Sequence, residues 1–244
     1  PDVADEYDCL IEQARFAETE GFASVWVADH DFTLAASIAE VTEHIRVGVV
    51  STPALLHPLK TAEDAAVLDL ISNGRLLFGA DPHISKENLE NCSIASEQTW
   101  SRFIEAMDII VRSWTHDGFA YLGEYNRIPL HTTAESLESG PFVAEPCDPP
   151  FIVPWQRAGM PVDYVSLQPK PQQIPRPPVF VRAADEKTAR FAASMGYSLL
   201  LEARNNQQFV ATCAQAYWHE LARAGRHRHE VTLAITLNIE VHED

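Results

Sequence analysis

The sequence predicts an α/β protein built on a parallel β-sheet, and one stretch shows why. Residues 61–72 carry apolar side chains at helical spacing, and Asn73-Gly74 then ends the helix, because glycine adopts a left-handed cap conformation without a Cβ clash. Leu76-Leu77-Phe78 follows at once as an uninterrupted apolar run, which is typical of a strand buried on both faces. Six strands predicted in this way alternate with helices, and that order indicates parallel strands joined by right-handed crossovers.

The other elements follow from the same patterns. An amphipathic helix ends at Gly21, and further helices are expected at 34–43, 97–114, 186–195 and 207–224. The six strands are expected near 24–29, 45–50, 75–79, 178–183, 198–202 and 231–241. Residues 141–178 hold 11 of the 16 prolines, so about 140–178 should form an irregular excursion from a single domain that spans 1–244.

The amino-acid composition indicates which kinds of binding partner and which cellular compartment to expect. Lys and Arg number 18 against 35 Asp and Glu, and the resulting net charge of -17 disfavours nucleic acid or an anionic membrane as a partner. No apolar run reaches the length of a membrane span. The four cysteines are scattered without a C-x-x-C pair, which suits a reducing compartment. We therefore expect a cytoplasmic protein with no nucleic-acid or membrane partner.

Helix–strand alternation leaves two architectures open, a doubly wound sheet and a TIM barrel. No G-x-G-x-x-G or Walker motif is present, which weakens the nucleotide-binding doubly wound alternative. Asp81, His83, Glu87 and Glu90 carry potential metal ligands, but carboxylates on a loop and helix start are usually solvated. We therefore expect no metal site.

Several short motifs together resemble the bacterial luciferase-like monooxygenase family in order and spacing. They are Gly21 to His30, Ile45 to Gly48, His57-Pro58, Ala62 to Asp64, Leu68-Asp69, Ser72 to Gly79 and Gln168 to Pro178. The resemblance implies a TIM barrel that binds reduced flavin, either FMN or, in one branch, a deazaflavin. It also implies insertion of one oxygen atom from O2 into a small organic substrate. Because no nicotinamide fingerprint is present, a separate flavin reductase would supply the reduced FMN.

The active site of a TIM barrel lies at the C-terminal ends of its strands. His30 stands at such an end and matches the family's catalytic histidine, which would hydrogen-bond near the reacting flavin edge or act as an acid or base. A structural histidine paired with Asp29 or Asp31 is the alternative. Val50 and Ser51 end the strand on which the family packs backbone against the isoalloxazine ring, although ordinary strand termination would also explain them.

Two further residues match the family's contacts to the flavin phosphate. Arg102 matches an arginine whose guanidinium would bind the dianion, and its alternative role is that of a solvated rim residue. Thr188 matches a threonine that acts together with a helix N-terminus, and its alternative role is plain N-terminal capping. We expect His30 and Arg102 to face one cavity, with Thr188 on its rim.

The chain also departs from the family. Asp81 stands in the loop assigned to cofactor binding, where the family often has glycine or arginine, and Pro82 beside it has no N–H. Asp185 stands where some members place a phosphate-binding serine, and its charge would repel a phosphate. These departures keep two alternatives open: a non-catalytic partner subunit without a flavin pocket, and a deazaflavin-dependent oxidoreductase.

The family's first strand precedes its first helix, and its eighth follows the strand that ends near Val241. We therefore expect an incomplete barrel in which these two strands are absent. The open edges would expose apolar side chains that fill the barrel, such as Val25 and Val27, and would favour a homo- or hetero-oligomer.

Overall fold

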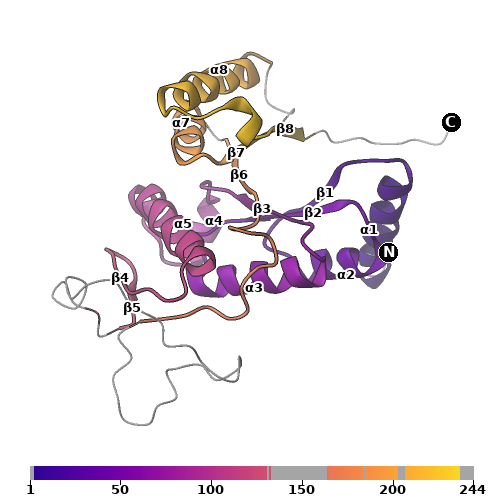
Figure 1. The fold of residues 1–244 in the computed structure, drawn as a ribbon, viewed down its shortest axis with the longest axis horizontal. Coiled ribbons are helices and arrows are strands. Elements are labelled where there is room, and N and C mark those ends of the chain that lie inside the picture. Colours follow the sequence, from indigo (N-terminus) through magenta and orange to yellow (C-terminus); the bar gives the residue numbers. More distant parts are fainter. Residues whose placement is uncertain (1–2, 131, 133–163, 184, 203–206, 237–244) are drawn as a thin grey trace, which may run out of the picture.

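The computed structural model describes residues 3–130, 132, 164–183, 185–202 and 207–236 (Figure 1). One parallel sheet, curled like part of a barrel, runs in the order β1-β2-β3-β6-β7-β8, and β4 and β5 form a separate antiparallel pair. The sheet strands are β1 (Ser24–Val27), β2 (Arg46–Ser51), β3 (Leu76–Ala80), β6 (Val179–Arg182), β7 (Ser198–Glu202) and β8 (Leu233–Thr236). This order follows the chain without a reversal, which is the order of a barrel; a doubly wound sheet reverses at its switch point.

The helices precede or follow these strands as the alternation predicts. They are α1 (Val3–Thr19), α2 (Phe32–Val41), α3 (Pro58–Ile71), α4 (Lys86–Asn91), α5 (Thr99–Thr115), α7 (Glu186–Met195) and α8 (Gln207–Arg223), with short 3-10 turns at Ser96–Gln98 and Arg228–Glu230. All six predicted strands are present among the described residues, and residues 237–241 of the last predicted strand lie outside them. Helix α4 lies where a helix start was expected around Glu87 and Glu90. The pair β4 (Tyr121–Leu122) and β5 (Arg127–Ile128) was not predicted, because two residues are too few to show a period.

Side chains and glycines set the helix ends. Asp31 caps α2 and Asp185 caps α7, in each case by accepting a hydrogen bond from the backbone N–H three residues later. At the end of α3, Asn73 and Gly74 both have positive φ, 54° and 77°, and the Gly74 N–H donates to Asp69 O at 2.7 Å. The predicted stop at Asn73-Gly74 is therefore confirmed, with the chain reversing directly into β3.

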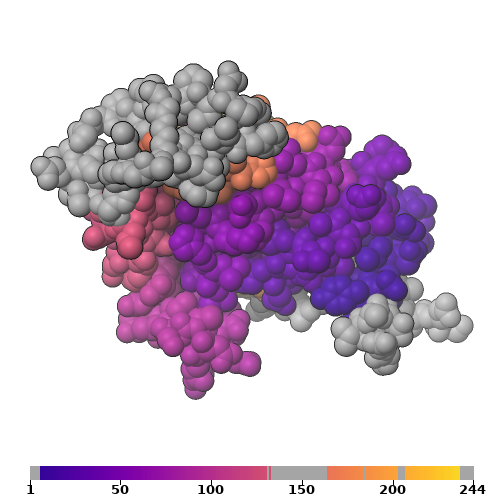
Figure 2. Space-filling model, turned by 90° about the horizontal axis from the view of Figure 1, so that it is seen from below, coloured from indigo at the N-terminus to yellow at the C-terminus, as the bar shows by residue number. Residues whose placement is uncertain are grey.

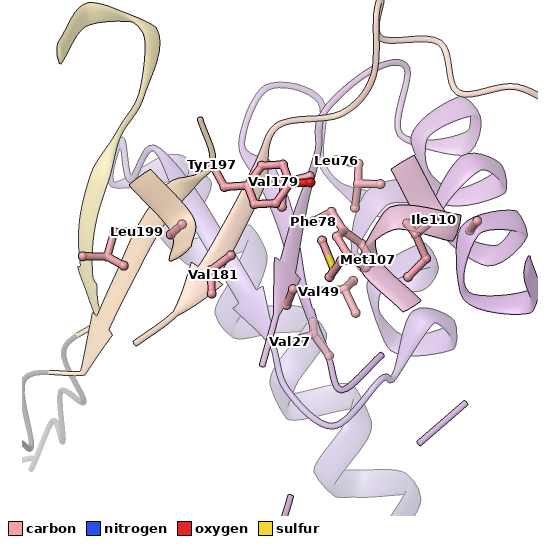
Figure 3. Close-up of a cluster of buried hydrophobic side chains, with 14 of the residues drawn as sticks. Val27, Val49, Leu76, Phe78, Met107, Ile110, Val179, Val181, Tyr197 and Leu199 are labelled. Carbon is pink, nitrogen blue, oxygen red and sulfur yellow. The ribbon is translucent and has the colours of Figure 1, made fainter. Parts of the chain in front are cut away.

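The sheet buries a larger apolar layer on one face than on the other. The helix face of the strands packs against α1, α2, α3, α5, α7 and α8, and Figure 3 shows its centre around Val49, Phe78, Met107 and Val181. The opposite face, here called the lumen face, carries a smaller cluster of Trp26, Val50, Leu77, Phe180, Leu200 and Ala234. All these helices lie on one side of the sheet, as they do in a barrel.

The prediction that Val25 and Val27 fill the barrel was wrong. Both pack in the helix-face cluster, and Val27 is 7% exposed. Successive side chains of a strand alternate between faces, so the lumen-facing residue between them is Trp26. Apolar composition alone did not reveal which face each valine takes.

The two outer strands of the sheet are open along one side. Among the described residues β1 pairs with β2 and β8 pairs with β7, and no pairing joins β1 to β8. An incomplete barrel, as predicted, accounts for this arrangement. Within the same residues, none of the helices has the length and apolarity needed to cross a membrane.

The described part of the proline-rich excursion, residues 164–178, is irregular apart from an isolated bridge between Phe119 and Val165. Gln173 ties it to the end of α3, where its backbone N–H and side-chain amide donate to the Asp69 carboxylate at 2.8 and 2.7 Å. In the space-filling view of Figure 2 this orange segment lies along the purple N-terminal half of the chain. Residues 140–163 of the predicted excursion lie outside the described residues.

Candidate active site at the carboxyl ends of the strands

His30 lies in a tight turn directly after β1. Asp29 and His30 both adopt positive φ, 57° and 63°, a region that non-glycine residues rarely occupy. Hydrogen bonds hold the turn: the His30 N–H donates to Val50 O at 3.1 Å, and the Phe32 N–H donates to His30 O at 2.8 Å. The turn places the imidazole over the end of the neighbouring strand β2.

The imidazole of His30 is bound at Nδ1. The Thr52 backbone N–H donates to Nδ1 at 2.8 Å, and Ser51 Oγ lies 3.1 Å from the same nitrogen. An amide N–H can only donate, so Nδ1 is the acceptor and the ring proton of the neutral form sits on Nε2. Burial lowers the pKa of His30, against the opposing effect of the nearby Asp29 and Asp81 carboxylates. The ring is thus a neutral imidazole with an Nε2–H donor.

The alternative role of His30 as a partner of Asp29 or Asp31 does not match these contacts. The Asp31 carboxylate accepts from the Leu34 N–H at 2.8 Å and from the Tyr7 hydroxyl at 3.0 Å. Asp29 is exposed. Ser51 is fully buried and contacts His30, whereas Val50 is half-buried on the lumen face.

Charged side chains at the next strand ends form a cluster of ion pairs that the sequence did not predict. Arg182, at the end of β6, donates from Nη1 to Asp81 Oδ2 at 2.6 Å and from Nη2 to Glu202 Oε1. Asp81 follows β3 and Glu202 ends β7, so the guanidinium joins three neighbouring strand ends. The Asp81 N–H also donates to Ser51 O at 2.8 Å. The polar band, as we call this group, thus lies at or just after the ends of five consecutive strands; it comprises His30, Ser51, Asp81, Arg182 and Glu202.

Arg102 lies apart from the polar band, in a cavity of about 270 Å³. The cavity is bounded by the loop after β2, the residues after α4, the first half of α5 and the β4–β5 turn; its polar lining includes His57, Arg102, Tyr125 and Asn126. The Arg102 guanidinium stacks 4.3 Å from the Tyr125 ring centroid and donates from Nε to Gln98 at 3.3 Å. Neither His30 nor Thr188 lines this cavity, so it does not unite the three predicted residues.

A buried carboxylate holds the β4–β5 turn that bounds the cavity. Glu105, 8% exposed on α5, accepts from the backbone N–H groups of Glu124, Tyr125 and Asn126 and from the Asn126 side chain, at 2.6–3.2 Å. A Cβ at Gly123 would lie 2.4 Å from this carboxylate, so the turn requires glycine there. Sequence periodicity gave no signal for this contact, because it joins residues 19–21 positions apart.

Thr188 is engaged by its own helix cap. Its backbone N–H and its hydroxyl both donate to Asp185 Oδ1, at 2.7 and 2.8 Å, and the residue is 2% exposed. These contacts match its alternative role as a capping residue. The Asp185 carboxylate already occupies the N-terminus of α7, where a phosphate would have to bind.

These contacts test whether the residues suit a flavin. The Arg102 cavity offers a guanidinium that suits a phosphate, whereas the Tyr125 hydroxyl and the Asn126 amide already contact Ser101 and Glu105, each at 2.8 Å. At the end of β2, contacts with Val50 O and Ser51 Oγ hold His30 in place. The N-terminus of α7 does not suit an anion, because Asp185 occupies it. The Arg102 cavity and the end of β2 therefore carry groups of the kind that a flavin needs, whereas the N-terminus of α7 does not.

Fold and site together define an α/β half-barrel with its polar groups at the carboxyl ends of the strands. The sequence profile of the luciferase-like monooxygenase family matches residues 2–244, and the chain belongs to this family. The oxygenase component of a flavin-dependent trigonelline monooxygenase from Acinetobacter baylyi is 28% identical over 204 residues. That match covers 78% of this chain and 47% of the relative, so the chain spans about half the length of this curated relative.

Solved structures with the same fold include enzymes of both cofactor types. The oxygenating constituent of 3,6-diketocamphane monooxygenase from Pseudomonas putida, in complex with FMN, has a TM-score of 0.71 and 16% identity over 96% of this chain and 62% of its own. An F420-dependent secondary alcohol dehydrogenase has a TM-score of 0.72 and 16% identity over 94% and 64%. At these identities the likeness establishes the fold, and it leaves both cofactors as candidates.

Proposed function

We propose that this chain carries the cofactor-binding part of a flavin-dependent monooxygenase that uses reduced FMN and O2 to oxidise a small organic substrate. The observation that carries the proposal is the neutral His30 imidazole, whose Nδ1 is held by Thr52 N–H at 2.8 Å at the end of a barrel strand. The flavin-dependent relative supports the choice of flavin. Bound reduced flavin would supply the two electrons with which one oxygen atom enters the substrate and the other leaves as water.

The chain's own residues would bind and orient this cofactor. Arg102 would hold the phosphate, since a guanidinium forms charge-assisted hydrogen bonds to its oxygens. Val50 and Ser51 would support the ring at the end of β2. His30 would present its Nε2–H toward the reacting edge as a hydrogen-bond donor, because its Nδ1 is already occupied. Asp81 is engaged by Arg182, so it would contribute to the site through that ion pair.

A deazaflavin-dependent oxidoreductase is the second candidate. An F420-dependent glucose-6-phosphate dehydrogenase from Amycolatopsis mediterranei, 30% identical over 137 residues and 48% of this chain, favours it. The same His30 donor would serve hydride transfer as well as oxygen insertion. A non-catalytic partner subunit is the third, and the Asp185 cap on α7 favours that alternative.

Anaerobic titrations with reduced FMN and with reduced F420, followed by absorbance and fluorescence, separate the three candidates. We expect saturable FMN binding that weakens at least tenfold in Arg102→Ala, because one charge-assisted contact contributes about 1.5–3 kcal/mol. Arg112→Ala is the matched control, since Arg112 lies on the same helix and pairs with Asp108 at 2.9 Å. Preferential F420 binding would support the second candidate, and binding of neither cofactor would support the third.

FMN binding followed by O2 admission tests the chemistry itself. A separate flavin reductase would regenerate the reduced cofactor in turnover assays. We expect O2 consumption to depend on reduced FMN and to incorporate one labelled oxygen atom into a substrate found by screening small organic molecules. Hydrogen peroxide as the sole product with every compound would contradict a monooxygenase role for this chain.

A further inference from the structure

The Arg182 guanidinium is fixed between two carboxylates at the mouth of the half-barrel. Alternation along β6 turns Phe180 and Arg182 to the lumen face, with the buried Val181 between them on the helix face. The Asp81 side chain in the resulting ion pair is 8% exposed, whereas Arg182 and Glu202 are 36% and 34% exposed. A pair with one nearly buried partner is screened less than a surface pair. Arg182 is therefore the ordered countercharge of a buried carboxylate.

The Asp81 carboxylate and the His30 ring share one neighbour. Ser51 contacts His30 Nδ1 with its hydroxyl, and its carbonyl oxygen accepts from the Asp81 N–H at 2.8 Å. The two oxygens of Asp81 are both engaged elsewhere: Oδ1 accepts from the His83 N–H at 2.8 Å and Oδ2 from Arg182 at 2.6 Å. The carboxylate is thus fixed on the far side of Ser51 from the imidazole, and its charge acts on the ring without a hydrogen bond between them.

We propose that Arg182 is a positioning residue for His30: it holds and offsets the Asp81 carboxylate, and so keeps the imidazole neutral with its proton on Nε2. The proposal rests on the proposed function only for the use that catalysis makes of that proton. Without Arg182, Asp81 would gain an unopposed charge and freedom to turn toward the ring. A carboxylate near an imidazole favours its protonated form.

The other charged groups around His30 give no equivalent countercharge. Asp29, in the same turn, is exposed and favours protonation as Asp81 does. Asp31 accepts from Leu34 N–H and from Tyr7 of α1, and the neighbouring β2 contributes only the neutral Ser51 and Thr52. Glu202, at the other end of the polar band, is paired with Arg182. Among the described residues of the polar band, Arg182 is the one cation that opposes these carboxylates.

The test is an NMR titration of the His30 ring in the full chain without cofactor. His30→Asn assigns the resonance among the 10 histidines. In Arg182→Met we expect the titration midpoint of His30 to rise by about one pH unit, as for a charge removed at intermediate distance in a partly solvated site. Arg182→Lys, which keeps a cation, should retain most of the wild-type midpoint. Arg112→Met should leave it unchanged, because the pair with Asp108 lies on the outer part of α5.

An unchanged His30 midpoint in folded Arg182→Met would overturn the inference. If Arg182→Met does not fold, Asp81→Asn decides: with Arg182 offsetting Asp81, loss of that carboxylate should lower the midpoint by less than about 0.3 pH unit. A larger fall would show that Arg182 does not offset it. These readouts need no flavin, so failure to bind FMN would count against the proposed function alone.

Discussion

The indole of Trp26 lies directly against the backbone of Gly48 on the next strand. The two residues are partners in the β1–β2 register, and a Cβ added at Gly48 would lie 2.3 Å from Cδ2 of the ring. Trp26 also meets Phe180 edge-on, with ring centroids 5.2 Å apart. The Trp26 ring, packed over Gly48 and against Phe180, is thus part of the apolar cluster on the lumen face.

Gly48→Ala should destabilise the chain by about 2–3 kcal/mol, because neither the backbone nor the ring can move away without losing other contacts. Urea unfolding followed by circular dichroism measures the change. In a Trp26→Val background the same substitution should cost less than about 1 kcal/mol, since the clashing ring is gone. Equal costs in both backgrounds would show that the clash with Trp26 is not the cause.

Substitutions of His30 and Arg102 should separate turnover from cofactor affinity. His30→Ala should lower turnover at least a hundredfold and change the Kd for reduced FMN less than threefold, because it removes a donor at the reacting edge. Arg102→Ala should weaken FMN binding at least tenfold with a smaller effect on turnover at saturation. Stopped-flow kinetics and equilibrium titration supply the two quantities. Similar losses of affinity in both variants would contradict these roles.

His30 should make stability depend on pH. Its pKa is lowered in the folded chain, first by burial, so below about pH 6.5 the unfolded chain binds more protons than the folded chain. Stability should therefore fall as pH drops through 6.5 toward the lower folded pKa, with no further loss from this group below it. Urea midpoints between pH 7.5 and 5 should fall more steeply in wild type than in His30→Asn. Parallel slopes would show that His30 does not contribute.

Glu105 should be a major stabilising contact of the β4–β5 turn. Glu105→Ala leaves the backbone N–H groups of residues 124–126 without their carboxylate, and we expect a loss of about 3 kcal/mol. Glu97→Ala, at an exposed position just before α5, should change stability by less than about 0.5 kcal/mol. Urea unfolding compares the two. A small effect at Glu105 would mean that water replaces the carboxylate at this turn.

The open edges of the sheet should promote association of this chain. β8 is an edge strand among the described residues, and its Ile235 is 49% exposed. Such edges pair readily with other chains, and lysine on an edge opposes pairing. Sedimentation velocity should show self-association that Ile235→Lys reduces. Ile174→Lys, at a 92% exposed position outside the strands, should not reduce it. A monomer at all concentrations, or an equal effect of both lysines, would contradict this prediction.

Predictions that rested on local patterns agreed with the structure. The helix stop at Asn73-Gly74 follows from backbone sterics at two residues, and the buried strands follow from short apolar runs. The position of His30 at the end of a strand is local, so the sequence predicts it, whereas its catalytic role follows from the family resemblance. For Thr188 the sequence leaves two roles open, because a helix start serves equally as a cap and as an anion site; in the structure Asp185 occupies this position.

By itself, therefore, the sequence determined the order of helices and strands, their parallel arrangement and the family, because propensity, periodicity and motif spacing act over a few residues. Only the tertiary structure decided that Val25 and Val27 face the helices. It alone brought Arg182 between Asp81 and Glu202, 101 and 20 positions away along the chain. Contacts of that kind depend on sheet register and curl, which emerge when all strands pack together.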